Sequence, residues 1–195
     1  MDARRIARVV GLGGAALAVG VAVSGGRARR TDERAFRAVN RLANEHVDGA
    51  ASAITELGSI WASVGGAAVL AARGHRRAAA RGLAAAGITW LAGQGLKRLF
   101  VRPRPYEADP EGTRLLIGPP KASSWPSSHP AVLLSFVEVA GREVGLARPG
   151  RAALAGLAGA VGASRVVVGV HYPGDVAGGL LLGRAVAEGV AGNGR

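Results

Sequence analysis

The chain has 195 residues, of which 49% are hydrophobic, with 31 glycines, no cysteine and a formal net charge of +12. This length provides for one domain, and the absence of cysteine excludes disulfides and thiolate metal sites. The excess of arginine over acidic residues favours anionic partners, which include nucleic acid, phospholipid headgroups and phosphorylated substrates.

Six hydrophobic segments follow one another along the chain. They are Val9–Val23, Leu57–Ala72, Leu83–Leu96, Ala131–Ala140, Ala152–Val170 and Val176–Val190. Several are shorter than the roughly 20 residues that a helix needs to cross a bilayer. Each short segment alone also fits a buried core helix, so their number and composition must decide between a membrane protein and a soluble helical domain.

Small residues recur four positions apart in the fifth segment, a spacing that allows close helix packing in lipid. They form two series along the helix, which are Gly156, Ala160 and Ser164, and Ala155, Gly159 and Ala163. The few embedded charges, Glu56, Glu138 and Arg184, are expected to face the bundle interior or an interface. Eight aromatic residues are few for a soluble core. We therefore predict an all-α fold, a six-helix transmembrane bundle in one domain over residues 1–195.

The first segment follows Arg4, Arg5 and Arg8, a pattern that also describes a secretory signal. The possible cleavage site at Ala22-Val23-Ser24 is weak, so we predict a retained anchor. Residues 1–52 would form this anchor and a charged amphipathic connection, and residues 53–190 the core of the domain. The proline-rich stretch Val101–Ser124 is predicted to be a loop.

If all six segments cross the membrane, three polar clusters fall on the same side, at residues 97–105, 125–130 and 164–175. The short loops Arg73–Arg81 and Gly141–Arg151 are rich in arginine and are predicted to be cytoplasmic. The clusters would then lie on the extracytoplasmic side of a multi-pass protein in the cell membrane.

The first cluster reads KRLFVRPRP and contains Lys97 and Arg104. More cations gather here than a helix end requires, and they would repel one another unless an anion joined them. Arginine grips phosphate with two parallel hydrogen bonds, and lysine adds a compact charge. A positively charged membrane anchor is the alternative for this run alone.

The second cluster, WPSSHP, contains Ser127, Ser128 and His129 and directly precedes an apolar run. Serine followed by proline is a good helix start, and the free amides there form an anion site. An imidazole beside bound phosphate can be held protonated and can donate to a leaving oxygen. A plain helix cap is the alternative.

The third cluster is SRVVVGVHYPGD. Arg165 lies in an apolar stretch and needs an anionic partner. We expect Asp175 to cap the last segment while its other oxygen holds one ring nitrogen of His171, which leaves the other nitrogen free to attack phosphorus. The alternative is a His and an Asp that merely close a turn.

Together these residues resemble the three-part signature of the type 2 phosphatidic acid phosphatase (PAP2) superfamily. The matching parts are Lys97 with Arg104-Pro105 after six residues, Pro126-Ser127-Ser128-His129, and Ser164-Arg165 with His171 and Asp175 at the family's spacing. Where Ser128 stands, the family often has glycine, so we expect an altered fit more than a loss of activity.

The resemblance implies a role for each residue. Lys97, Arg104 and Arg165 would bind phosphate oxygens, with help from Ser127 and the amides near Ser128. His171 would form a phosphohistidine, Asp175 would orient it, and His129 would protonate the leaving group. The resemblance implies no metal and no other cofactor, and three cations around the site would repel a divalent ion.

The leading hypothesis is thus a lipid phosphate phosphatase whose substrate is a polyprenyl phosphate, a polyprenyl diphosphate such as undecaprenyl diphosphate, or a phosphatidate-like lipid. A vanadate-dependent haloperoxidase and a non-catalytic phosphate-binding membrane protein are the alternatives. Arginines scattered between apolar segments, with few aromatics to stack on bases, argue against nucleic acid. The expected partners are membrane lipids and the lipid phosphate substrate, and a homo-oligomer is left open.

Overall fold

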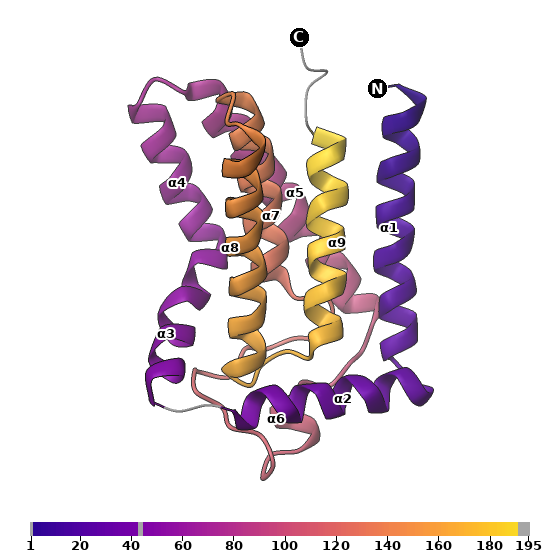
Figure 1. The fold of residues 1–195 in the computed structure, drawn as a ribbon. Helices are drawn as coiled ribbons and strands as arrows, with labels where there is room; N and C mark the ends of the chain where they lie inside the picture. The colour runs from indigo at the N-terminus through magenta and orange to yellow at the C-terminus, as the bar shows by residue number, and fades with distance from the viewer. Residues whose placement is uncertain (1, 43–44, 191–195) are drawn as a thin grey trace.

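The computed structural model describes residues 2–42 and 45–190, and all regular elements in that part of the chain are helical (Figure 1). The elements are α1 (Ala3–Val23), α2 (Gly26–Arg41), α3 (Glu45–Thr55), the short 3-10 helix η1 (Glu56–Gly58), α4 (Ile60–Ala72), α5 (Arg76–Leu99), α6 (Pro105–Ala108), α7 (Ser128–Glu143), α8 (Arg148–Val167) and α9 (Pro173–Val190).

Helices α1, α4, α5, α7, α8 and α9 stand roughly upright as a bundle, and α2 lies across one end of it (Figure 1). Helix α7 is the centre of the bundle, since all of its residues from Pro130 to Gly141 are buried. It contacts α5, α8 and α9, while α1 packs on the outer side of α9. Val132 and Phe136 of α7 meet Ala86 of α5 and Val161 of α8 in the main apolar core.

The predicted all-α helical bundle is confirmed, because the six hydrophobic segments correspond to α1, α4, α5, α7, α8 and α9. The charged connection after α1 is the amphipathic helix α2, whose buried face carries Asp32, Phe36 and Asn40. The segment predicted as continuous from Leu57 to Ala72 is instead broken, and the helices on its two sides differ in direction by 66°. At the break, Ser59 begins α4 by accepting a hydrogen bond from the Ala62 amide at 3.1 Å.

The prediction that the small residues of α8 pack closely is wrong for Gly156 and Ala160, which are exposed. A Cβ built on Gly156 meets no atom within 4 Å. A close approach on α8 occurs instead at Gly162, where a Cβ would lie 2.4 Å from Val176, and on α9 a Cβ on Gly179 would lie 2.2 Å from the Ser127 carbonyl oxygen. Helix α8 faces the bundle with Ala158 and Val161 instead.

The side chain of Trp125, in the loop before α7, is fully buried. The indole lies between α1 and α9, because a Cβ on Gly20 or Gly178 would come within 2.7 Å and 2.4 Å of it. Phe100 packs against its ring at a centroid distance of 4.3 Å. The loop before α7 is thereby fixed to both neighbouring helices.

Among the described residues, α1 is the only unbroken helix that is long and apolar enough to cross a membrane. The bent pair His46–Gly58 and Ile60–Ala72 meets the same criterion if its two helices are counted as one span. Glu138 and Arg184, the charges embedded in α7 and α9, pair at 2.5 Å. Their neighbours Glu188 and Arg142 pair at 2.7 Å. The charges are therefore compensated between helices, at the end of the bundle away from α2.

Candidate active site

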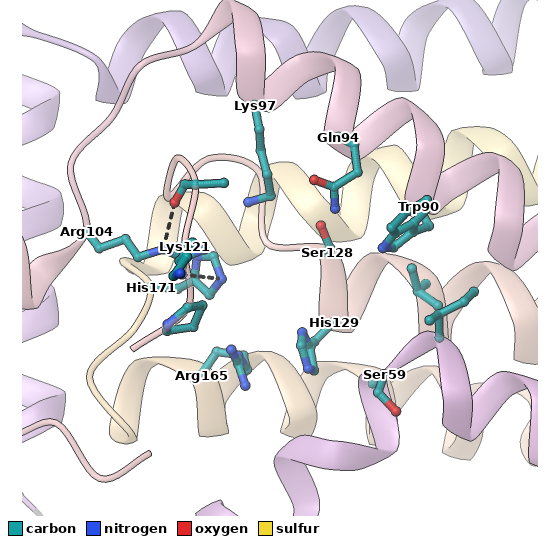
Figure 2. A pocket seen from close by; sticks show the side chains of 15 residues that line it. Ser59, Trp90, Gln94, Lys97, Arg104, Lys121, Ser128, His129, Arg165 and His171 are labelled. Atoms are coloured by element: carbon teal, nitrogen blue, oxygen red, sulfur yellow. Dashed lines mark hydrogen bonds between the residues drawn. The ribbon is translucent and has the colours of Figure 1, made fainter. Parts of the chain in front are cut away.

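A cavity of about 250 Å³ opens at the end of the bundle where α2 lies. The end of α5, the loop before α7, the start of α7 and the end of α8 surround it (Figure 2). Residues from all three sequence clusters line it, namely Lys97, Arg104, Ser128, His129, Arg165 and His171. The fold thus brings together side chains that are up to 74 positions apart in the sequence, from 97 to 171.

Lys97, Arg104 and Arg165 are buried cations, with exposed fractions of 9%, 3% and 2%. Each is held by neutral oxygens. Lys97 Nζ donates to the Ser123 carbonyl at 2.8 Å, Arg104 Nη1 to the Val170 carbonyl at 2.9 Å, and Arg165 Nη1 to Thr55 Oγ1 at 2.8 Å. Across residues 2–42 and 45–190, none of the three forms an ion pair.

Buried cations are costly without a counter-charge. The anionic partner that Arg165 requires is not supplied by the described protein residues, and its Nε is buried without a hydrogen-bond acceptor. The hydroxyl of Ser128, which also borders the cavity, is buried and without a partner as well. Three cations and an unsatisfied hydroxyl around one space are suited to hold an anion.

His171 lies at this site in a defined tautomer. Its Nε2 is 3.3 Å from Arg104 Nη1 (Figure 2). A guanidinium only donates hydrogen bonds, so Nε2 is the acceptor and carries a lone pair. The ring proton is therefore on Nδ1, which faces Asp175. Burial, and then the charges of Arg104, Lys97 and Arg165, hold the pKa of His171 well below the usual 6.5.

Asp175 lies behind His171 and does not border the cavity. It is in the first turn of α9 and is fully buried. Its Oδ2 accepts hydrogen bonds from the Tyr172 amide at 2.8 Å and from Ser124 Oγ at 2.5 Å, and it is 3.5 Å from His171 Nδ1. The Asp175 carboxylate thus holds the turn that carries His171, and Ser124 lies beside their contact, 3.5 Å from Nδ1.

Ser127 precedes α7 as its N-cap residue, and its side chain makes no capping hydrogen bond. Its amide donates to the Asp175 carbonyl at 3.0 Å, and its hydroxyl is buried without a partner. Ser127 does not line the cavity, whereas Ser128 and His129 in the first turn of α7 do. His129 therefore stands across the cavity from the Arg104–His171 contact (Figure 2).

Three residues at the site were not singled out from the sequence. Arg102 joins Asp175 at 2.5 Å and Asp32 of α2 at 2.7 Å, and Ser124 joins Asp175. Arg102 and Arg104 both precede a proline in the same basic run, so residue type alone does not tell which of them faces an anion. Asp32 lies among several charges of α2, and only its buried position on the helix distinguishes it.

The model of the PAP2 superfamily matches residues 77–191, which is more than half of the chain. The chain belongs to the PAP2 superfamily. The matched range contains all three of the sequence clusters that line the cavity. Within the described residues, no three His, Cys, Asp or Glu side chains form a metal-binding group.

Two curated relatives of this PAP2 chain come from two strains of Mycobacterium tuberculosis, CDC 1551 / Oshkosh and ATCC 25618 / H37Rv. Both are named decaprenylphosphoryl-5-phosphoribose phosphatase. Each is 35% identical over 91 residues, which cover 47% of this chain and 47% of the relative. The match thus spans about half the length of these relatives.

Two solved structures share the PAP2 fold. A transmembrane PAP2-type phosphatidylglycerolphosphate phosphatase from Bacillus subtilis superposes with a TM-score of 0.76 at 22% identity, over 94% of each chain. LpxE from Aquifex aeolicus superposes with a TM-score of 0.69 at 24% identity, over 78% of this chain and 89% of its own. At these identities the likeness concerns the fold.

Proposed function

We propose that this PAP2 protein is a membrane phosphatase that hydrolyses a lipid phosphate or diphosphate through a phosphohistidine, without a metal ion. The observation that carries the proposal is the meeting of three buried, uncompensated cations with two histidines at one cavity. A phosphoryl group supplies the negative charge that these cations lack. The membership of the superfamily and the phosphatase names of its relatives support the same reaction.

Binding comes first. Lys97, Arg104 and Arg165 hold the non-bridging phosphate oxygens, and the unsatisfied Arg165 Nε and Ser128 hydroxyl donate to them. The amides at the start of α7 add a positive helix end. Lys97, Arg104 and Arg165 are each held by a protein hydrogen bond before substrate arrives, so little reorganisation is needed when charge develops in the transition state.

His171 then attacks. The Nε2 lone pair forms a bond to phosphorus while the bond from phosphorus to the leaving oxygen breaks, and His129 gives that oxygen a proton. The imidazole becomes positively charged, and its Nδ1–H faces the Asp175 carboxylate, which stabilises that charge. In the second step His129 takes a proton from water, water oxygen bonds to phosphorus, the Nε2–phosphorus bond breaks, and inorganic phosphate leaves.

The arrangement in the membrane is part of the proposal. We place α1, α4, α5, α7, α8 and α9 across the bilayer, and the arginine-rich turns between α4 and α5 and between α7 and α8 in the cytoplasm. The cavity lies at the opposite end of the bundle, and therefore on the extracytoplasmic side.

A second candidate substrate follows from the outer part of the cavity. Beyond the cations, it is lined by Trp90 and Gln94 of α5 and by Ser59 at the helix break. Gln94 makes no hydrogen bond to any described residue, and its amide both donates and accepts, as hydroxyl groups require. An indole face and a free amide suit a sugar. Together with the name of the mycobacterial relatives, they favour a lipid-linked sugar phosphate over a bare prenyl phosphate.

A substrate panel tests the proposal. Detergent-solubilised protein is given polyprenyl diphosphate, polyprenyl monophosphate, phosphatidate and a lipid-linked phosphosugar, and the release of inorganic phosphate is measured without added metal and with a chelator. We expect turnover of at least one lipid phosphate, inhibition by vanadate, and a trapped phosphoprotein after acid-free quenching. The His171→Ala variant should release none. If it matched the wild-type rate, the phosphohistidine mechanism would be wrong.

A further inference from the structure

A buried ionic network connects α2 to Asp175. The Arg102 guanidinium bridges two carboxylates, with Nη1 at 2.5 Å from Asp175 Oδ1 and Nη2 at 2.7 Å from Asp32 Oδ2. All three side chains are buried, with at most 8% exposed. The guanidinium also lies 4.1 Å from the centre of the Tyr172 ring, where the attraction between a cation and an aromatic face adds to its fixation.

The network fixes the orientation of the Asp175 carboxylate. A carboxylate held at one oxygen can rotate, whereas one held at both oxygens has a fixed plane. Arg102 holds Oδ1, while Ser124 and the Tyr172 amide hold Oδ2. Oδ2 is the oxygen nearest to His171 Nδ1. Arg102 therefore helps to set the orientation of the Asp175 carboxylate relative to the His171 imidazole, although Arg102 does not line the cavity.

Asp32 completes the arrangement from α2. Its Oδ2 receives the second arm of Arg102, and its Oδ1 accepts a hydrogen bond from the Gly174 amide at 2.8 Å. Gly174 directly precedes Asp175, so α2 holds both the charged partner of Asp175 and the backbone beside it. Burial raises the pKa of Asp32 and Arg102 counteracts this, as expected of a carboxyl that depends on its buried partner.

We propose that Arg102, which stands between Lys97 and Arg104 of the first motif, and Asp32, which lies outside the three motifs, are positioning residues that align Asp175 and, through it, His171. This inference rests on the proposed function. It makes α2 part of the catalytic apparatus: the helix holds the carboxylate in the one orientation that accepts the Nδ1–H as Nε2 bonds to phosphorus. Outer-shell partners of this kind typically change rates 10- to 100-fold when they are lost.

The variants Arg102→Lys and Asp32→Asn test the proposal. Lysine keeps the charge but lacks the fork that spans two carboxylates, and asparagine removes the charge at nearly constant shape. We expect kcat to fall by about 10- to 100-fold in both variants, with KM and inhibition by inorganic phosphate changed by less than about threefold, because the phosphate-binding cations are untouched. Asp32→Glu should recover part of the kcat that Asp32→Asn loses.

The step affected is measured by rapid quenching. Because the alignment of His171 affects the step that forms the phosphohistidine, the rate of that step should fall in parallel with kcat in the two variants. Glu33→Gln is the matched control, because Glu33 is the next carboxylate on α2 and pairs with Arg29 rather than with the network. It should keep the wild-type kcat. Ser124→Ala, which removes one hydrogen bond and no charge, carries the test if Arg102→Lys does not fold.

A purely structural role predicts a different result. In that case the variants would melt at lower temperature but would keep the wild-type kcat when assayed well below the transition, and our inference would be overturned. The proposed function would stand, since wild-type turnover and its loss in His171→Ala are measured in the same assay. An active His171→Ala variant would instead overturn the proposed function.

Discussion

A substitution at Arg165 can separate the contribution of its positive charge from that of its several hydrogen-bond donors. Thr55 holds Nη1 at 2.8 Å, and Nε is left buried without a partner. Arg165→Lys keeps the charge but removes this second donor, so we expect kcat/KM to fall by about 10- to 100-fold. Phosphate release under subsaturating substrate measures it. Arg98→Lys is the control, since Arg98 is exposed on α5 beside Lys97, and its kcat/KM should not change.

His171 should remain neutral where a free imidazole is half protonated, at about pH 6.5. Burial and the neighbouring cations lower its pKa, so the folded protein binds this proton less tightly than the unfolded chain. The native state therefore loses stability as pH falls through about 6.5. Melting temperatures between pH 7.5 and 5 should fall more steeply in the wild type than in His171→Gln. Equal slopes in the two proteins would contradict the lowered pKa.

The residues that face the cavity could largely be predicted from the sequence, because phosphate recognition requires particular side chains at particular spacings. Lys97, Arg104, Ser128, His129, Arg165 and His171 all line the cavity. Arg102 and Asp32 could not be predicted, because their role depends on a contact between segments 70 positions apart. Ser128 is accommodated in place of the family's glycine by Gly93 of α5, where a Cβ would lie 3.3 Å from its hydroxyl.

At the scale of elements, α9 packs on α7 through glycine. A Cβ on Gly179 would lie 2.2 Å from the Ser127 carbonyl oxygen, which is backbone and cannot move aside. We expect Gly179→Ala to cost roughly 1–3 kcal/mol of stability, as overpacked sites do, and to lower kcat because α9 carries Asp175. Thermal unfolding in detergent measures the first effect and phosphate release the second.

Gly156→Ala provides the matched control for this substitution. Gly156 is exposed on α8, and a Cβ there meets no atom within 4 Å. Alanine also has the higher helix propensity, by about 1 kcal/mol at most. The variant should melt at the wild-type temperature or slightly above it. A loss of stability as large as that of Gly179→Ala would show that a Cβ is harmful wherever it is placed, and not because of the contact with Ser127.

The elements that were predicted well are those with long, uninterrupted hydrophobic patterns, such as α1, α5 and α8. The break before α4, at Gly58 and Ser59, was not predicted, because the hydrophobic run resumes directly after these two residues. Its cause is tertiary: Gly58 lies against His129 and Val161, where a Cβ would come within 2.6 Å and 2.8 Å. The pattern of hydrophobic residues around Gly58 does not predict a contact with residues that lie more than 70 positions away in the sequence.

The orientation of the whole molecule can be tested by labelling, because the chain has no cysteine. Glu111→Cys lies in the loop at the cavity end, and His75→Cys in the turn between α4 and α5 at the other end. In intact cells a membrane-impermeant maleimide should label position 111 and not position 75, since we place the arginine-rich turns in the cytoplasm. After cell lysis both should react. The reverse pattern in intact cells would place the cavity in the cytoplasm.

Trp125 has a consequence for the N-terminal helix. Its indole is enclosed on one side by Gly20 of α1, and it stands two residues before Ser127 in the loop that begins the catalytic part of α7. Proteolytic removal of the first 23 residues would remove the packing of α1 against the Trp125 indole and leave a cavity beside the second motif. We therefore expect a form shortened at residue 23 to melt at a lower temperature than the full chain and to release phosphate more slowly.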